Sequence, residues 1–298
     1  MRSRTVNQLS FGIDVGGTNI RMALVSVSGE VMASKMIPGS SGLGPTDLTT
    51  LISENLRLMG GAENPIGIGL SLAGTVFDRG EMRADMTNLP RLAAFPFVDI
   101  VEEATGLACR VENDATAAMR AEARFGAATG VGNAVCLTLG TGIGSGLLLD
   151  GKIRGGAHGN GGEVGQFRMG GGGCKVQVLE DMASPGGLLR RTGLSAESLM
   201  AAASAGDHEA AKRMDEVFDL LGLTIANLHL LLDLEVAVLC GGLTGSGQPL
   251  TDGVCQAFAK YCPAPYQFGL DIRLSKLGDF SGAIGAASLW FHDAVRIP

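Results

Sequence analysis

The residues best suited to chemistry lie in the stretch FGIDVGGTNIRMALV, where an aspartate and a threonine flank two glycines. The apolar residues around them predict strands over Phe11–Val15 and Ile20–Val25, joined by a tight turn that only glycines make easily. Backbone N–H groups at glycines can approach a bound oxyanion, and Asp14 at the lip of the turn can hold a metal ion through water. The stretch predicts a phosphate and metal site, with a plain β-hairpin as the alternative.

A second glycine turn repeats this plan in Val135–Leu149, VCLTLGTGIGSGLLL, where two apolar strands flank Gly-Thr-Gly. Two such hairpins, one in each half of the chain, predict duplicated domains that face a shared cleft with a nucleotide between them. No G-x-x-x-x-G-K-[ST] loop occurs, so the turns are not Walker A loops. The first turn also leads into a strand and not a helix, which excludes the dinucleotide fingerprint.

The sharpest catalytic candidate is Asp114, in VENDATAA, between a predicted strand over Cys109–Glu112 and a predicted helix over Ala115–Phe125. A carboxylate at the carboxyl end of a strand in an α/β domain points into the ligand crevice. There it can accept the proton of a hydroxyl that attacks a phosphoryl group. The alternative is a helix N-cap, a task that Asn113 could share.

Three further positions carry weaker signals. Glu163, in the glycine-rich GGEVGQF, and Glu180 can accept hydrogen bonds from sugar hydroxyls, or they are solvated loop acids. Gly241-Gly242 follows the predicted strand Val236–Leu239 and leaves room for an adenine or ribose, or it is a plain strand-to-helix turn.

Composition bounds the class of protein. The chain has 298 residues, of which 46% are hydrophobic and 18% charged, enough for two modest α/β domains. The net charge of -7 and the lack of a Lys/Arg run argue against nucleic acid, and Leu220–Leu234 is too short and polar to span a membrane. The first ten residues lack the apolar core of a signal peptide, and six cysteines form no C-x-x-C pair. We therefore expect a reduced, cytoplasmic protein with no membrane or nucleic-acid partner.

Strands and helices alternate along both halves, which predicts two α/β domains. Besides the segments above, the pattern predicts strands over Val31–Ile37, Ile66–Leu70 and Asp271–Leu274, and helices over Thr46–Met59, Phe97–Glu103, Glu180–Arg191, Asp207–Leu234, Gln248–Tyr261 and Gly282–Ala294. The helix over Asp207–Leu234 is either continuous or broken near Gly222, and Asp207 is its candidate N-cap.

Taken in order, GIDVGGTNIR, VENDATAA, LTLGTGIGSGLLLDGK, GGEVGQ, VLEDMAS and VLCGGL resemble the ROK family of sugar kinases. The resemblance covers nearly the whole chain and implies the two-domain actin-like, hexokinase-like ATPase fold, which is ribonuclease H-like, with a cleft between the domains. It implies that Asp114 is the catalytic base and that ATP and Mg²⁺ are the cofactors, with Asp14 serving the Mg²⁺ of Mg-ATP. It also implies an ATP site at Gly16, Gly17, Thr18, Gly140, Thr141, Gly142, Gly241 and Gly242, and a sugar site at Asn113, Glu163, Gln166, Glu180, Asn88 and Gly74.

Two departures from the family pattern matter. Many members have a histidine that binds sugar and zinc where this chain has Gln166, and a cysteine-rich zinc loop where this chain has Cys174 alone. One cysteine with a distant His158 does not make a four-ligand site, so we expect no zinc. The loop is then held by packing and not by metal.

From these residues we expect an ATP-dependent kinase that phosphorylates a hydroxyl, the 6-hydroxyl foremost, of a hexose or N-acylhexosamine. The alternatives are a non-catalytic sugar-binding or regulatory protein, or a kinase for a disaccharide or β-glucoside. We place the N-terminal domain at residues 1–118, with a C-terminal helix at 281–298 packed back on it, and the larger domain at 119–280. The resemblance also suggests a homodimer.

Overall fold

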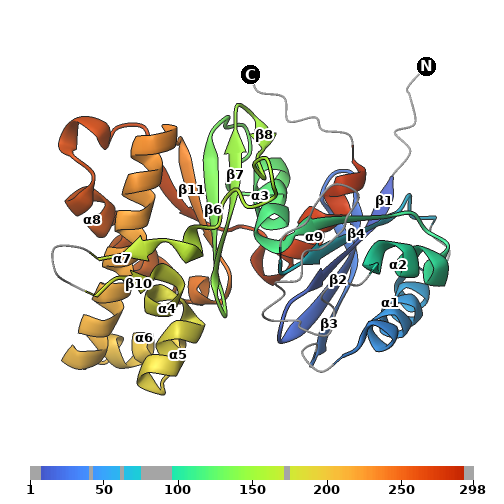
Figure 1. The fold of residues 1–298 in the computed structure, drawn as a ribbon, viewed down its shortest axis with the longest axis horizontal. Helices are drawn as coiled ribbons and strands as arrows, with labels where there is room; N and C mark the ends of the chain where they lie inside the picture. The colour runs from blue at the N-terminus through green and yellow to red at the C-terminus, as the bar shows by residue number, and fades with distance from the viewer. Residues whose placement is uncertain (1–7, 40–42, 61–63, 75–95, 171–174, 292–298) are drawn as a thin grey trace. The chain divides into compact units, whose positions relative to one another are not determined.

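The computed structural model describes residues 8–39, 43–60, 64–74, 96–170 and 175–291 (Figure 1). Its contacts divide the chain into two compact units. The first holds residues 1–125, 155–160 and 280–296, and the second holds 126–154, 161–279 and 297–298. Each unit has its own sheet and its own hydrophobic core, so each is described by itself.

The first unit is built on a five-stranded mixed sheet in the order β3-β2-β1-β4-β5. Three strands form an antiparallel meander, and β4 and β5 continue the sheet in parallel with β1. The carboxyl ends of β1, β4 and β5 therefore lie at one edge of the sheet. The strands are β1 (Leu9–Val15), β2 (Asn19–Ser26), β3 (Val31–Pro38), β4 (Ile68–Leu72) and β5 (Cys109–Asn113).

Helices cover both faces of this sheet (Figure 1). On one face, α1 (Pro45–Gly60) and α2 (Phe97–Thr105) bury apolar side chains against the odd-numbered residues of β1. On the other face, α9 (Ser281–Ala287) packs against β1, β4 and α3 (Asp114–Phe125). The expected helix over Gly282–Ala294 is shorter than predicted, because a 3-10 turn replaces it at Ser288–Trp290.

Glycines allow α9 to approach the sheet. A Cβ on Gly12 of β1 would overlap the carbonyl oxygen of Ala283, and one on Gly69 of β4 would overlap that of Ala286. These glycines sit in strand interiors, where the lack of a side chain normally weakens a strand. Here the lost strand stability is offset by close contact between a helix backbone and a sheet.

The second unit contains a five-stranded sheet in the order β12-β11-β6-β7-β8. The strands β6, β11 and β12 are parallel, and β7 and β8 are antiparallel additions that follow β6. The carboxyl ends of β6 and β11 therefore meet at one edge. The strands are β6 (Ala134–Leu139), β7 (Ile143–Leu149), β8 (Lys152–Ile153), β11 (Val236–Cys240) and β12 (Asp271–Leu274).

The helices of the second unit confirm some predictions and correct others. The long helix α7 (His208–Leu232) is continuous, with Asp207 as its N-cap, and Gly222 lies inside it against Ala257 and Phe258 of α8 (Gln248–Tyr261). A helix at Ala196–Ser204 (α6), capped by Ser195, was not predicted.

The single helix predicted over Glu180–Arg191 is wrong. Two helices, α4 (Leu179–Ala183) and α5 (Pro185–Thr192), meet at Ser184. Ser184 has extended backbone angles, and its Oγ accepts a hydrogen bond from the N–H of Gly187 at 2.8 Å. A residue that precedes proline disfavours the helical conformation, so Pro185 breaks the run and starts the next helix.

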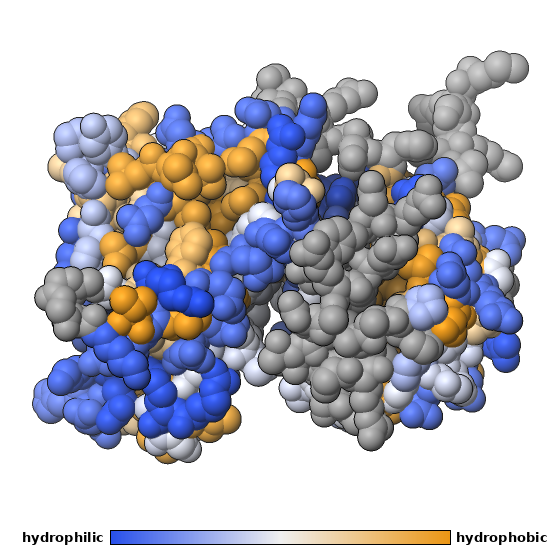
Figure 2. All heavy atoms as spheres, viewed as in Figure 1, coloured by the Kyte–Doolittle hydropathy of each residue, from blue (hydrophilic) through white to orange (hydrophobic). Residues whose placement is uncertain are grey.

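Hydrophilic side chains cover much of the face in Figure 2, but an apolar area lies over the end of α7, where Leu230 and Leu231 are exposed. Within the described residues no helix is both long and apolar enough to cross a membrane.

The contact between α9 and β4 gives a stability prediction. We expect Gly69→Ala to lower the thermal midpoint by about 2–10 °C, because overpacking a core costs about 1–3 kcal/mol. Gly155→Ala is the matched control, since an added Cβ there meets nothing within 4 Å. Equal midpoints for the two variants in a calorimetric scan would contradict this account of the glycine.

Candidate active site

Asp14 ends β1 at the edge where the parallel strands of the first unit finish. Its side chain is 14% exposed, and the hydroxyl of Ser71 on β4 donates to its Oδ1 at 2.6 Å. Arg21 on β2 lies farther away, with Nη1 at 3.7 Å from Oδ2. On the remaining side the carboxyl group touches α9, where a Cβ on Gly282 would come within 2.8 Å of Cγ.

This environment raises the pKa of Asp14. Burial is the largest cause, because it penalises the charged form, while the Ser71 hydrogen bond and the Arg21 charge lower the pKa by smaller amounts. A divalent cation bound near the carboxylate would favour its charged form. The oxygen donor fits Mg²⁺, which binds proteins through one or two carboxylates together with substrate phosphates and water.

The Gly-Gly turn beside Asp14 is closed by its own backbone. The N–H of Gly16 donates to the carbonyl of Asn19 at 3.1 Å, and the carbonyl of Thr18 accepts from Gly39 at 2.8 Å. The side chain of Thr18 is exposed. The turn therefore presents a fixed backbone with a hydroxyl at its surface, next to the carboxylate.

Asn113 takes the helix-capping role that the sequence left open between it and Asp114. The Oδ1 of Asn113 accepts from the N–H of Thr116 at 3.0 Å, so Asn113 caps α3. Its Nδ2 donates to Asp114 Oδ1 and to the carbonyl of Gly74, both at 3.1 Å. Asp114 Oδ1 also accepts from the N–H of Ala115 at 2.8 Å. Asn113 thus orients the carboxylate of Asp114 at the first residue of the helix.

Strand register places Asp14 and Asp114 at the same sheet edge. Val15 pairs with Leu72, and Leu72 pairs with Asn113, in two parallel ladders. Both aspartates are therefore at the carboxyl ends of strands, where open α/β sheets bind ligands.

In the second unit, the Gly-Thr-Gly turn joins β6 to β7. The N–H of Gly140 donates to the carbonyl of Gly142 at 3.0 Å, which closes the turn. The Oε2 of Glu180, on α4, accepts from the N–H of Ile143 at 2.9 Å. Glu180 therefore contacts the residue that directly follows the turn.

Glu163 lies near Glu180. It precedes the 3-10 turn Val164–Gln166, in which Gln166 is exposed. Glu163 keeps an exposed face, but nearby protein removes part of its hydration, and this loss, with the charge of Glu180, raises its pKa. The structure thus brings the two candidate sugar acids together in one unit.

Gly241 directly follows β11 and lies close to Leu139, the residue before the Gly-Thr-Gly turn. Its φ of 93° favours glycine, and a Cβ there would lie 2.6 Å from the carbonyl oxygen of Leu139. Leu139 immediately precedes Gly140, so the third glycine motif packs against the strand that carries the second. Gly242 follows and begins a 3-10 turn.

Asn88 and Cys174 lie outside the described residues, and Gly74 contributes its carbonyl to Asn113. Among the residues that are described, no group of three His, Cys, Asp or Glu side chains could hold a metal ion by itself.

The sequence did not identify the residues that hold Asp14. Ser71 and Arg21 contact it through neighbouring strands, and Gly282 contacts it through a helix some 270 residues away in the chain. The sequence does contain a signal for Ser71, because it is the one polar residue in the otherwise apolar strand β4, IGLSL.

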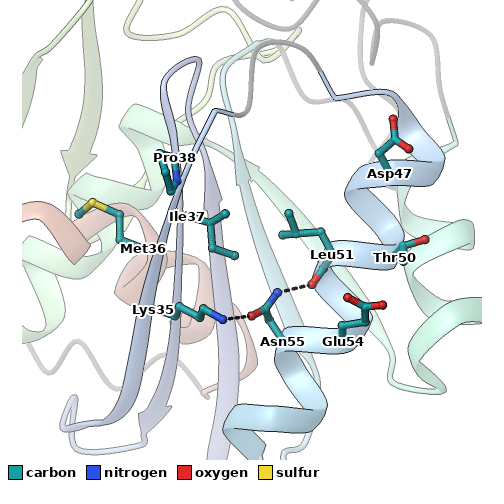
Figure 3. Close-up of a pocket in the computed structure, with 9 residues that line it drawn as sticks. All are labelled: Lys35, Met36, Ile37, Pro38, Asp47, Thr50, Leu51, Glu54 and Asn55. Carbon is teal, nitrogen blue, oxygen red and sulfur yellow. Dashed lines mark hydrogen bonds between the residues drawn. The ribbon is translucent and has the colours of Figure 1, made fainter.

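A surface pocket lies elsewhere in the first unit, between β3 and α1 (Figure 3). Lys35 Nζ donates to Asn55 Oδ1 at 2.6 Å, and Asn55 Nδ2 donates to the carbonyl of Leu51 at 2.7 Å. None of the predicted site residues lines this pocket, so we assign it no part in the candidate site.

A sequence model of the ROK family matches residues 10–293. This chain belongs to the ROK family. It is 34% identical to a glucokinase of Halalkalibacterium halodurans over 310 aligned positions, covering 93% of each chain. It is 30% identical to an N-acetylmannosamine kinase of Escherichia coli, covering 96% of this chain and 99% of the relative.

The fold agrees with this membership. A ROK family glucokinase of Streptomyces griseus, solved in complex with glucose and AMPPNP, superposes with a TM-score of 0.83 at 26% identity. The match covers 94% of this chain and 98% of that one. The predicted actin-like ATPase fold of the ROK sugar kinases is therefore confirmed.

The raised pKa of Asp14 predicts a pH-dependent stability difference. The folded protein keeps the Asp14 proton to higher pH than the unfolded chain does, so stability is lost as pH rises from the unfolded pKa through the folded pKa. Asp14→Asn removes this loss. Without ligands, we expect it to raise the thermal midpoint at about pH 7.5, by an amount that shrinks towards about pH 4.

Asp215→Asn, at an exposed position on α7, is the control for this comparison. It should change the midpoint little at either pH. A lower midpoint for Asp14→Asn than for the unmodified protein at neutral pH would show that the contacts of this carboxylate with Ser71 and Arg21 outweigh the cost of its burial.

Proposed function

We propose that this protein is an ATP-dependent kinase that transfers the γ-phosphoryl group to a hydroxyl of a hexose or N-acylhexosamine, most directly the 6-hydroxyl. The observation that carries the proposal is the arrangement at Asp114: a carboxylate oriented by a helix cap, on the same sheet edge as Asp14. The kinase relatives of both sugar classes support it.

The residues take the following roles in this proposal. Asp114 accepts the proton of the attacking hydroxyl or orients it, and Asn113 holds Asp114 in position. Glu163, Glu180 and Gln166 bind sugar hydroxyls. The two glycine turns, with Thr18 and Thr141, bind the phosphates through backbone N–H and hydroxyl groups, and Gly241-Gly242 accommodates the adenosine.

Mg²⁺, when bound with ATP at Asp14, neutralises charge on the transferring phosphoryl group. The protein's part is to position the nucleotide and the sugar and to exclude water, since phosphoryl transfer depends on positioning and electrostatic stabilisation. The assigned residues come from both units. The homodimer and the cytoplasmic location remain predictions from the sequence.

The decisive test is ADP release from Mg-ATP with a panel of glucose, mannose, fructose, allose, N-acetylglucosamine, N-acetylmannosamine and cellobiose. Asp114→Asn should reduce turnover by about 10²–10⁴, the usual effect of losing a general base, and leave the fold and sugar affinity largely unchanged. Near-normal turnover in this variant would refute the role of Asp114. Sugar binding by calorimetry without turnover of any sugar would favour the non-catalytic alternative.

A further inference from the structure

Glu180 belongs to α4, which packs against β7 and against the 3-10 turn Val164–Gln166. Its Oε2 accepts a hydrogen bond from the N–H of Ile143, the residue that follows the turn Gly140-Thr141-Gly142, which we call the phosphate turn. From the other direction, a Cβ on Gly165 would overlap the carbonyl of Ile143 and lie 3.5 Å from Glu180 Oε2. Gly165 belongs to the 3-10 turn that carries Gln166 and follows Glu163. The peptide groups of Ile143 are thus close to both candidate sugar-binding elements, Glu180 and the turn at Gly165.

The two glycines of the phosphate turn, Gly140 and Gly142, differ in how close they lie to Glu180. A Cβ on Gly142 would overlap Glu180 Oε2 and lie 2.9 Å from its Cδ, whereas one on Gly140 would meet nothing within 4 Å. Neither glycine is among those with positive φ, so the backbone accepts alanine at both positions. An alanine at position 142 would therefore collide first with the carboxylate of Glu180, which would have to move.

We propose that Glu180 is a positioning residue for the phosphate turn, through which sugar binding and nucleotide binding are coupled. The inference rests on the proposed function, in which Glu180 also binds sugar. A carboxylate can accept several hydrogen bonds, so one oxygen can hold Ile143 while the group accepts a sugar hydroxyl. A sugar that fixes this carboxylate also fixes the turn, and nucleotide bound at the turn favours sugar in return.

The coupling has a consequence that separate sites do not share. A substitution in the phosphate turn that displaces the Glu180 carboxylate should weaken sugar binding with no nucleotide present, and loss of Glu180 itself should weaken nucleotide binding with no sugar present. Glu163 supplies the contrast, because it is the other candidate sugar acid and no described hydrogen bond joins its side chain to the turn.

The first experiment measures calorimetric affinity for the sugar of the panel that the unmodified protein binds best, without nucleotide. Gly142→Ala should weaken it by about tenfold, since a displaced charged hydrogen-bonding group costs affinity on this scale, and Gly140→Ala should not. In a Glu180→Ala background, Gly142→Ala should have no further effect, because the group with which it collides is gone.

The second experiment measures AMPPNP affinity without sugar. Glu180→Ala should weaken it several-fold, because a backbone N–H next to the turn loses its charged acceptor, whereas Glu163→Ala should leave it unchanged. This arm needs no sugar and no folded Gly142 variant, so it decides the inference even if Gly142→Ala does not fold.

The outcomes separate the inference from the proposed function. Suppose that the unmodified protein binds both ligands, that Gly142→Ala binds sugar as tightly as Gly140→Ala, and that Glu180→Ala binds AMPPNP as tightly as Glu163→Ala. The coupling role of Glu180 is then refuted, and the proposed kinase activity remains. If the unmodified protein binds neither a sugar nor AMPPNP, the proposed function and the inference both fail. A tenfold loss in Gly142→Ala that persists in the Glu180→Ala background would also refute the role of Glu180.

Discussion

Parallel strand pairing at fixed register is the constraint on which the candidate site residues of each unit depend. In the first unit, Val15, Leu72 and Asn113 are partners across β1, β4 and β5, so their chain ends emerge side by side. In the second unit, Cys240 pairs with Thr138, which sets the end of β11 beside the turn after β6. A one-residue slip would turn each side chain to the other face of its sheet and would separate Asp14 from Ser71. Register thus specifies the chemistry as directly as residue type does.

The same constraint places a carboxylate where it is costly. Asp14 lies on the sheet face that α9 covers, and Gly282 allows the helix to approach this side chain closely. Burial raises the pKa of Asp14, and the hydroxyl of Ser71 only partly compensates for lost hydration. A group held in this way gains from a cation more than a solvated aspartate would. Burial of this carboxylate thus costs the ligand-free protein some stability, a cost that a bound cation would reduce.

The sequence predicted the parts of the site that are short-range. Glycine turns between apolar strands, and the strand-to-helix junction at Asn113-Asp114, are local patterns, and the structure contains them at the predicted positions. The break at Ser184-Pro185 was equally local but was missed, because the apolar periodicity continues across it. Because α6 is rich in small residues, its start was not recognised from the sequence. The cap at Ser195 marks that start.

The contacts made by Ser71, Arg21 and Gly282 could not be predicted in this way, since they depend on which strands and helices become neighbours. The hydrogen bond from Ile143 to Glu180 spans 37 residues and joins a strand to a helix. Local sequence assigns Glu180 only an exposed or ligand-binding role. The closeness of Glu180 to Gly142 becomes apparent only when β7 and α4 are placed in the fold. A Cβ on this glycine, which the sequence assigned to a phosphate motif, would collide with the carboxylate of Glu180.

The glycine-rich segment around Glu163 is tied to its own unit by burial and hydrogen bonds. Val164 and Gly165 are buried, the hydroxyl of Ser145 donates to the carbonyl of Gly162, and Leu179 donates its N–H to the carbonyl of Phe167 at 2.9 Å. A short antiparallel pair, β9 (Arg168–Met169) with β10 (Gln177–Val178), fixes the residues that follow. These bonds leave Gln166 exposed beside the two acids. An amide there can donate and accept at any physiological pH, so it can bind a hydroxyl without the protonation equilibrium that a histidine would bring.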